Sequence, residues 1–349
     1  MNLLAEVESR FGGSALNPRL HGPLGDHIPV ADGYVIVVFD GLGSHQVDPR
    51  NAPVLADARK ADLDAPFPAT TTVSLASIAT GMTPRQHGLL GYQLWVPEVD
   101  TVVNTIKWTT LWGTPVSYDT RRLLPRPNLW ERLAQLGVES FTVQPANFDR
   151  SPLSLALYRS CLFEPAARTE DLVAGTLRVA GPGRLVVTYV PHIDFAAHVY
   201  GQKSAEYAEA LDLVSRVWSE LGARLPTRTA LLGTADHGHV DFPARSQSKI
   251  SRADHDGRVF YGDGRAMFVK GEAADLAETL PATWVPIDDA RHWWGPGNSH
   301  PRFDERAPDG VLLADDDALL LHRFSDDRMI GNHGAMTTAE QKVPLLIRS

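Results

Sequence analysis

Three aspartates follow short apolar segments of this chain, and their carboxylates could bind metal ions. Asp40 comes directly after VIVVF, Asp194 lies just past VVTYV, and Asp236 lies just past ALLGT. Short runs rich in branched residues predict buried strands, and open α/β sheets bind ligands beyond the carboxyl ends of such strands. An aspartate at a strand end is also a common turn former or helix cap, so each position is ambiguous when taken alone.

Two of these aspartates have histidine neighbours. Asp194 and His198 are four residues apart, a spacing that on a helix places a carboxylate and an imidazole on one face, close enough to share a metal ion. An ordinary Asp/His helix pair has the same spacing, and His192 would be a rival ligand if the segment were extended. Asp236 and His237 are adjacent at a predicted strand end.

A further histidine, His333, lies in GNHGAM shortly before the last apolar segment. Its neighbours Asn332 and Gly334 offer little apolar cover, so a buried structural role is less expected here than for most histidines. Imidazole is a common metal ligand, and this residue is therefore a candidate for the same site.

A run of three threonines, residues 70–72, begins a small-residue segment with helical character. A threonine before a helix is commonly an N-cap. A hydroxyl at the positive end of a helix is also a candidate nucleophile, because a developing alkoxide and a phosphate are both favoured there. Adjacent threonines can serve both roles, so the segment predicts capping and possible covalent chemistry together.

The elements that position these residues follow from the apolar pattern. Short branched segments predict strands, and apolar residues recurring at three and four positions predict helices. Their alternation predicts an α/β fold with a doubly wound, mostly parallel sheet and helices on both faces. The expected strands are 35–39, 141–143, 185–190, 230–232 and 343–347, and two expected helices are 128–136 and 204–221.

We expect a single catalytic domain spanning residues 1–349, because no internal repeat or low-complexity segment divides the chain. The segments 92–126 and 241–323 carry more Gly, Pro, Trp and charge than periodic structure. We expect them to be insertions that form a cap over the site. Their tryptophans would build small cap cores or stack on an aromatic part of a substrate.

The ordered combination of motifs resembles the alkaline phosphatase superfamily, and best its nucleotide pyrophosphatase/phosphodiesterase branch. The resemblance covers nearly the whole chain and rests on seven positions in five motifs. It implies an alkaline phosphatase-like fold and a hydrolase of phosphoester or pyrophosphate bonds with two zinc ions. The implied ligands of one zinc are Asp194, His198 and His333, and those of the other are Asp40, Thr71, Asp236 and His237.

The resemblance also selects the nucleophile among the three threonines. The nucleophile of this family lies nine residues before the threonine of a Thr-Gly pair, here Thr80 and Gly81, which identifies Thr71. Thr70 and Thr72 are then expected to cap or pack. The implied chemistry is an in-line displacement through a phosphothreonine intermediate, with two metals that stabilise the attacking and leaving oxygens.

The chain departs from the family pattern at two positions. The phosphodiesterase branch usually has an asparagine three residues after the nucleophile and another at the end of the His-Gly segment, where this chain has Ser74 and Tyr92. The second asparagine normally donates to a phosphate oxygen. We expect Tyr92 to supply a phenolic donor instead, with Asn104 as a less favoured replacement, and these departures leave the substrate preference open.

Three further histidines, His87, His239 and His300, match no ligand position of the family. The runner-up functions are a phosphomonoesterase or a phosphonate hydrolase of the same superfamily, and, less favoured, a non-catalytic metal-binding relative. A sulfatase is not expected, because Cys161 lies far from the nucleophile position. Oxygen and nitrogen ligands also suit manganese, iron or cobalt in place of zinc.

Composition and charge narrow the partners. The formal net charge is −9 and no basic run is present, which argues against a nucleic-acid polymer as partner. Three aspartates and two zinc ions would still leave the site about one unit positive and attract a small phosphorylated substrate, with a nucleotide-like compound as one candidate. Without an apolar stretch of signal-peptide or membrane-span length, we expect a soluble, cytoplasmic protein. No oligomeric state is predicted.

Overall fold

A computed structural model describes residues 1–348. Its main sheet has the strand order β2-β18-β9-β1-β8-β6-β7. Strands β1, β8, β9, β6 and β7 are parallel to their neighbours, whereas β18 runs antiparallel to both β9 and β2. The predicted mostly parallel sheet is confirmed. The strand bounds are β1 Gly33–Phe39, β2 Arg59–Asp64, β6 Glu139–Pro145, β7 Leu162–Ala166, β8 Arg184–Val190, β9 Thr229–Thr234 and β18 Lys342–Arg348.

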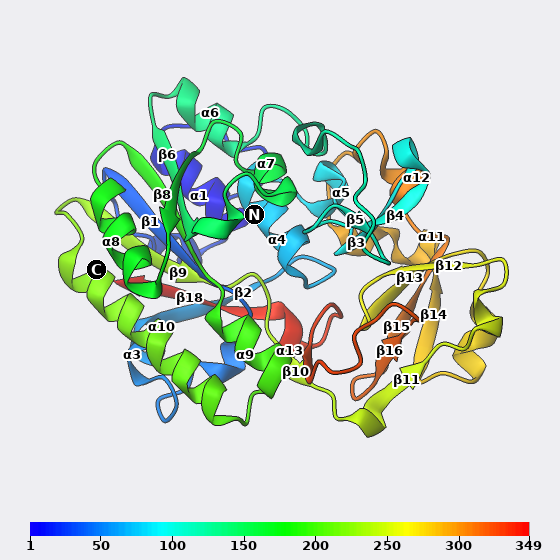
Figure 1. The fold of residues 1–349 in the computed structure, drawn as a ribbon. Helices are drawn as coiled ribbons and strands as arrows, with labels where there is room; N and C mark the ends of the chain where they lie inside the picture. Colours follow the sequence, from blue (N-terminus) through cyan, green and yellow to red (C-terminus); the bar gives the residue numbers. More distant parts are fainter. Residues whose placement is uncertain (349) are drawn as a thin grey trace.

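Helices cover both faces of this sheet (Figure 1). Strand β1 is buried along its length, and its alternate side chains enter two different cores. Ile36 and Val38 belong to the core with α1, α4, α6 and α7, whereas Val35 and Val37 belong to the core with α3, α8, α9 and α10. The bounds are α1 Asn2–Arg10, α3 Pro53–Ala58, α4 Thr71–Thr80, α6 Leu129–Gln135, α7 Pro152–Leu157, α8 Thr169–Val179, α9 His192–Tyr200 and α10 Ala205–Arg224.

Both helices expected from the sequence are present, and polar caps fix where they begin. Asn128 accepts a hydrogen bond from the Glu131 main-chain amide at the start of α6, and Ser204 accepts one from Tyr207 at the start of α10. Such caps satisfy amides that the helix itself leaves unpaired. None of the helices in residues 1–348 has the length and apolar character that crossing a bilayer requires.

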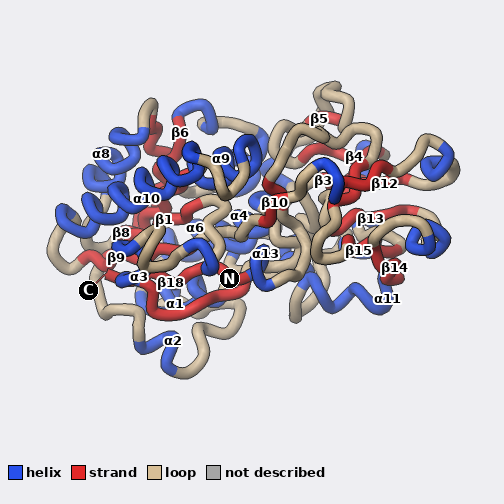
Figure 2. Tube along the Cα trace, turned by 90° about the horizontal axis from the view of Figure 1, so that it is seen from below, coloured by secondary structure: helices blue, strands red, loops and turns tan. Residues whose placement is uncertain are grey.

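The segments 92–126 and 241–323 form smaller sheets beside the α/β part, as the ribbon and the tube views show (Figures 1 and 2). We call these segments together the cap. The first holds the sheet β3-β4-β5, and the second holds the four-stranded sheet β12-β13-β15-β14 and the pair β11-β16. The bounds are β3 Gln93–Val96, β4 Thr101–Asn104, β5 Thr109–Thr110, β11 Gln247–Lys249, β12 Val259–Gly262, β13 Ala266–Lys270, β14 Ala282–Pro286, β15 Gly310–Ala314 and β16 Leu319–Leu321.

The cap tryptophans mainly build cores. Trp108 and Trp294 are buried, and Trp294 packs edge-on against Phe67 and donates a hydrogen bond to the main-chain carbonyl of Leu90. Trp112 differs, because it is 61% exposed and lies against Phe324. The packing role therefore accounts for Trp108 and Trp294.

A buried ion pair joins the cap to the main sheet. Arg265, directly before β13, and Glu340 on α13 (Thr338–Gln341) have fully buried side chains, and their charged atoms are 3.1 Å apart. Glu340 also accepts hydrogen bonds from the Ala335 amide and the Thr337 hydroxyl. These contacts fix the loop that carries His333 from two sides.

Candidate metal centre and active site

Three adjacent strands bring the three predicted aspartates together. Strands β9, β1 and β8 are neighbours, so their carboxyl ends open onto one edge of the sheet. The Gly41 amide donates to Asp236 Oδ1 at 3.1 Å, and the Asp194 amide donates to the Asp40 main-chain carbonyl at 3.0 Å. Strand ends remote in sequence thus meet at one point of the molecule.

The helix expected around Asp194 is α9. Asp194 lies in its first turn, and His198 lies one turn further on, with 3.2 Å between His198 Nε2 and Asp194 Oδ1. Because the segment is helical, the condition for His192 to be a rival ligand is not met. His192 instead forms a hydrogen bond with Thr169 Oγ1 at 3.0 Å.

Three histidines direct the same ring nitrogen toward the centre. The Nδ1 atoms of His198, His237 and His333 lie 2.6, 3.1 and 2.7 Å from main-chain carbonyl oxygens of Gly331, Gly238 and Ala69. A carbonyl only accepts, so each Nδ1 carries the proton and each Nε2 keeps its lone pair. This arrangement is typical of metal-binding histidines, whose other nitrogen is fixed by a hydrogen bond.

The ligand atoms fall into two groups that could each hold a metal ion. Asp194, His198, His239 and His333 form one group, and Asp40, Asp194 and His237 form the other, with ligand atoms within 4.8 Å of one another in each. Thus all three predicted ligands of the first zinc lie together, and so do Asp40 and His237 of the second.

Asp236 lies beside the second group. Its Oδ1 accepts hydrogen bonds from the Gly41 and His237 amides, whereas its Oδ2 is buried, 3.6 Å from His237 Nε2, and without a hydrogen-bond partner in residues 1–348. A buried carboxylate oxygen without a donor is costly. A bound cation would satisfy this oxygen, so the residues present fit a metal ion.

Thr71 is the first residue of α4, and its hydroxyl faces the second group. Thr71 Oγ1 lies 3.0 Å from His237 Nε2 and 3.5 Å from Asp40 Oδ1. Thr70 is the N-cap residue but its side chain makes no capping hydrogen bond, and Thr72 is fully buried. Only the second of the three hydroxyls is thus directed at the carboxylate and imidazole atoms.

The charges at this site repel one another in the absence of cations. Burial raises the pKa of Asp40 well above its usual value, and the carboxylates of Asp194 and Asp236 raise it further. Burial acts in the same direction on Asp194, but His198 and His239 hold the pKa of that carboxyl well below its usual value. Burial and the neighbouring His237 lower the pKa of His333, which keeps that imidazole neutral and able to bind a metal.

His239 is a member of the cluster that sequence analysis assigns no role. Its Nε2 donates to Asp194 Oδ1 at 2.8 Å, whereas its buried Nδ1 has no partner in the described chain. It therefore lacks the carbonyl contact that fixes the other three rings, and its geometry is that of a hydrogen-bond donor to the Asp194 carboxylate. The signal in the sequence is the alternation His237-Gly-His239, since alternate residues of extended backbone point the same way.

Sequence comparison identifies the family. A profile described as type I phosphodiesterase/nucleotide pyrophosphatase matches residues 34–336. The chain belongs to this family. A search of curated protein sequences finds no match.

Solved structures of phosphodiesterase and hydrolase relatives share the fold. Human ectonucleotide pyrophosphatase/phosphodiesterase 5 is 16% identical, with a TM-score of 0.68 over 90% of this chain and 87% of its own. Its murine counterpart was solved in an inactive threonine-to-alanine form in complex with AMP. It is 16% identical, with a TM-score of 0.67 over 89% of this chain and 87% of its own. Phosphonoacetate hydrolase from Sinorhizobium meliloti 1021, in complex with phosphonoformate, is 17% identical, with a TM-score of 0.68 over 92% of this chain and 91% of its own.

Membership of the type I phosphodiesterase/nucleotide pyrophosphatase family makes this chain a hydrolase of phosphoester bonds. The predicted family and enzyme class are therefore confirmed, and so is the alkaline phosphatase-like fold. The family is metal-dependent, and the Asp/His groups described above are the candidate metal site of this member.

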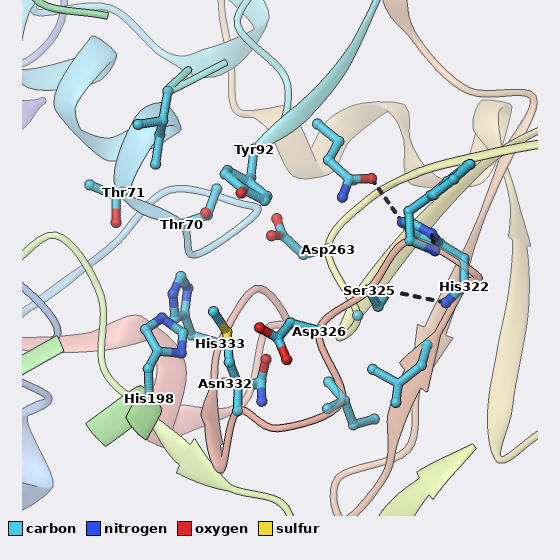
Figure 3. Close-up of a pocket in the computed structure, with 18 of the residues that line it drawn as sticks. Thr70, Thr71, Tyr92, His198, Asp263, His322, Ser325, Asp326, Asn332 and His333 are labelled. Atoms are coloured by element: carbon cyan, nitrogen blue, oxygen red, sulfur yellow. Dashed lines mark hydrogen bonds between the residues drawn. The ribbon is translucent and has the colours of Figure 1, made fainter. Parts of the chain in front are cut away.

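The cap closes one side of a cavity of about 450 Å³ that opens onto the metal site (Figure 3). Thr71, Asp194, His198 and His333 border it on the sheet side. We call four of the cap residues that border its other side the distal wall: Tyr92, Gln93, Asp263 and His322.

Tyr92, which borders this cavity, is in direct contact with Asn104. Asn104 Oδ1 accepts the amides of Ile106 and Lys107, which directs its Nδ2 toward the Tyr92 hydroxyl at 2.6 Å. Because the Tyr92 oxygen accepts this hydrogen bond, its own proton is free for another acceptor. Burial raises the pKa of Tyr92, so the phenol keeps that proton at neutral pH. Ser74, the other departure from the family pattern, donates instead to the Asp236 main-chain carbonyl at 2.7 Å.

Proposed function

We propose that this enzyme hydrolyses phosphodiester or nucleotide pyrophosphate bonds through a phosphothreonine intermediate on Thr71, with two zinc ions as cofactors. The observation that carries the proposal is the position of Thr71 Oγ1, 3.0 Å from His237 Nε2 and 3.5 Å from Asp40 Oδ1, at the start of α4. A single catalytic domain with two cap segments would perform this reaction.

The donor set supports two cation sites. Asp194, His198 and His333 would hold one zinc, and Asp40, Thr71, Asp236 and His237 would hold the other. The unpartnered Asp236 Oδ2 and the carbonyl-fixed imidazoles support these assignments. When bound, the two ions supply Lewis acidity to the phosphoryl oxygens and to both the attacking and the leaving oxygen. His239 would orient Asp194 without being a ligand.

Thr71 would attack phosphorus. Its oxygen forms the new P–O bond and gives up its proton to solvent water, while the bond to the leaving alcohol breaks and that oxygen takes a proton back from water. Water then cleaves the phosphothreonine, which restores the hydroxyl. The start of α4 favours this chemistry, because the unpaired main-chain amides of a helix N-terminus stabilise a developing alkoxide and a phosphate.

Tyr92 would donate its free proton to a phosphoryl oxygen, in place of the asparagine that the family pattern has at this position. Asn104 would act through Tyr92 and not by direct contact, since its Nδ2 is used in the hydrogen bond to the phenol. A donor fixed in advance stabilises negative charge that grows in the transition state more than a mobile one does.

The neighbours support a small phosphorylated substrate. The murine relative was solved with AMP, and the Sinorhizobium relative with phosphonoformate and phosphonoacetate. Those phosphonates carry a carboxylate, which the Asp263 carboxyl in the distal wall would disfavour. We therefore place a phosphodiester ahead of a phosphonate, a phosphomonoester or a non-catalytic role.

A comparison of rates on one zinc-loaded preparation tests this assignment. Bis(p-nitrophenyl) phosphate, p-nitrophenyl phosphate, phosphonoacetate and a nucleotide pyrophosphate would be compared by kcat/KM. We expect the diester or the pyrophosphate to exceed the monoester and the phosphonate by at least about tenfold, the ratio that 1.4 kcal/mol of differential binding gives. A preference for the monoester or the phosphonate would contradict the proposed function.

A further inference from the structure

A buried tyrosine, Tyr189, contacts one of the proposed metal ligands from outside the metal cluster. It is the second-last residue of β8, and it is 6% exposed. Its hydroxyl donates a hydrogen bond to Asp40 Oδ2. Groups that hydrogen-bond to a metal ligand orient that ligand and affect how tightly the metal binds, so this contact is a candidate for such a role.

The pairing of β1 with β8 places the phenol beside Asp40. The two strands are parallel neighbours, and Val38 is directly opposite Tyr189. Both residues belong to the core on the α4 side of the sheet. Because side chains alternate along a strand, Asp40 returns to the same side as Val38, and the Asp40 amide extends the pairing by donating to the Val190 carbonyl at 3.0 Å. A tyrosine at this position is long enough to reach the Asp40 carboxyl.

The two oxygens of the Asp40 carboxyl have different neighbours. Oδ1 lies 3.5 Å from Thr71 Oγ1 and 3.4 Å from His237 Nε2, which are two of the proposed ligand atoms. Oδ2 instead accepts the hydrogen bond from Tyr189. One oxygen is therefore directed at the metal site, and the phenol occupies the other.

The phenol is suited to be a permanent donor. Burial raises the pKa of Tyr189 well above its usual value, and the carboxylates of Asp40, Asp236 and Asp194 raise it further, so the hydroxyl keeps its proton at neutral pH. An ionised carboxylate only accepts hydrogen bonds, which makes the phenol the donor. Its ring packs against Phe148, with the ring centroids 6.2 Å apart, and this packing helps to hold the hydroxyl in place.

We propose that Tyr189 is a positioning residue for the zinc ion of Asp40, Thr71, Asp236 and His237. By donating to Asp40 Oδ2, it leaves Oδ1 alone to bind the metal. Without the phenol, Asp40 would be free to rotate or to bind through both oxygens, and a second oxygen would take the open position that a catalytic metal needs for its substrate. This inference rests on the proposed function and gives Asp40 an orienting partner, as His239 is for Asp194.

Zinc titration of the metal-free enzyme tests the inference without relying on turnover. We expect Tyr189→Phe to bind two ions, with the affinity for one lowered by about 10- to 100-fold and the affinity for the other near its wild-type value. Two unchanged affinities, or an equal loss at both sites, would overturn the inference and leave the proposed function standing. A wild-type enzyme that binds fewer than two zinc ions, or does not hydrolyse bis(p-nitrophenyl) phosphate, would contradict the proposed function itself.

Tyr261→Phe is the matched control. The Tyr261 ring is fully buried in the cap, and its hydroxyl donates to the Arg306 main-chain carbonyl at 3.2 Å. This variant also loses one buried hydrogen bond of a phenol, so melting temperatures of the two variants separate an effect on stability from an effect on the metal. We expect both zinc affinities of Tyr261→Phe to match the wild type. A loss of affinity equal to that of Tyr189→Phe would overturn the inference.

Two non-natural side chains at position 189 isolate the donor itself. 4-Aminophenylalanine keeps an N–H donor where Tyr189 has its hydroxyl, whereas 4-fluorophenylalanine fills that space without a donor. We expect the amino side chain to retain most of the wild-type zinc affinity and the fluoro side chain to lose it as phenylalanine does. Equal affinities for these two proteins would overturn the inference, and this comparison applies even if Tyr189→Phe does not fold.

Discussion

The metal cluster and the distal wall border the same cavity but are assembled in different ways. The metal cluster lies just after strands of the main sheet, on helices α4 and α9, or on loops fixed to that sheet. Its members are Asp40, Thr71, Asp194, His198, Asp236, His237, His239 and His333. The distal wall comes from two cap segments, with Tyr92 before β3 and Asp263 between β12 and β13. In the proposed function, elements of the main sheet position the reacting groups, whereas the cap determines which substrate reaches them.

The largest effect should come from the nucleophile of the metal cluster. Thr71→Ala removes the attacking oxygen, and we expect kcat on bis(p-nitrophenyl) phosphate to fall by at least about 10³-fold, with a conservative Thr71→Ser variant recovering part of the rate. Zinc content measured by elemental analysis should stay near two ions per chain. Thr72→Ala is the control, since the Thr72 hydroxyl is buried without a partner; an equal loss there would contradict the choice of Thr71.

Within the metal cluster, a ligand should behave differently from a residue that orients a ligand. His333→Ala removes an Nε2 lone pair and should eliminate one of the two bound zinc ions. His239→Gln should keep both ions but lower the affinity for one of them by about 10- to 100-fold, because this change removes only a hydrogen bond to a ligating carboxylate. Titration of the metal-free variants with zinc would measure the number of bound ions and their affinities. Loss of an ion in His239→Gln, with only weaker binding in His333→Ala, would show that His239 is the ligand and His333 the orienting residue.

The junction between the two regions should matter for stability. Glu340→Gln leaves the Arg265 guanidinium buried without its counter-charge, and breaking such a pair costs about 3–5 kcal/mol. Urea unfolding measures the loss. Glu305→Gln is the control, because the Glu305–Arg302 pair is about half exposed and should contribute less than about 1 kcal/mol. Similar losses in the two variants would show that burial does not distinguish these pairs.

The smallest expected effect concerns the distal wall. Tyr92→Phe removes the phenolic donor and should lower kcat/KM on all phosphodiesters by about 10-fold, the value of roughly 1.4 kcal/mol of transition-state stabilisation. Asn104→Ala should act in the same direction but less strongly, because it only frees the phenol to rotate. Tyr200→Phe is the control, since that ring is 44% exposed. A Tyr92→Phe enzyme with unchanged kcat/KM would exclude a role for the hydroxyl.

The same contrast explains what the sequence could predict. Most strands of the main sheet are short segments rich in branched apolar residues, so the apolar pattern identified β1, β6, β8, β9 and β18. Because ligands bind beyond the carboxyl ends of such strands, the residues after β1, β8 and β9 were then the candidates for the site. The Asp194/His198 spacing had meaning because α9 is one regular helix. Signals that span a few residues were sufficient for this region.

The distal wall depends on contacts between distant segments. Asp263 lies in YGDG, which as sequence is an ordinary hairpin turn. Only its packing against Gly334 brings the carboxyl to the cavity, and no local pattern encodes that contact. His239 was overlooked for a related reason, since its role depends on a hydrogen bond to Asp194, 45 residues away.

Covalent labelling of the nucleophile tests the central claim most directly. The zinc-loaded enzyme would be mixed with bis(p-nitrophenyl) phosphate, quenched in acid during turnover, digested and analysed by mass spectrometry. The account predicts an ester-linked phosphoryl adduct on the peptide that contains Thr71, localised to that residue and absent from Thr71→Ala. Steady turnover with no adduct on this peptide, or an adduct on Thr70, Thr72 or a residue elsewhere, would contradict it.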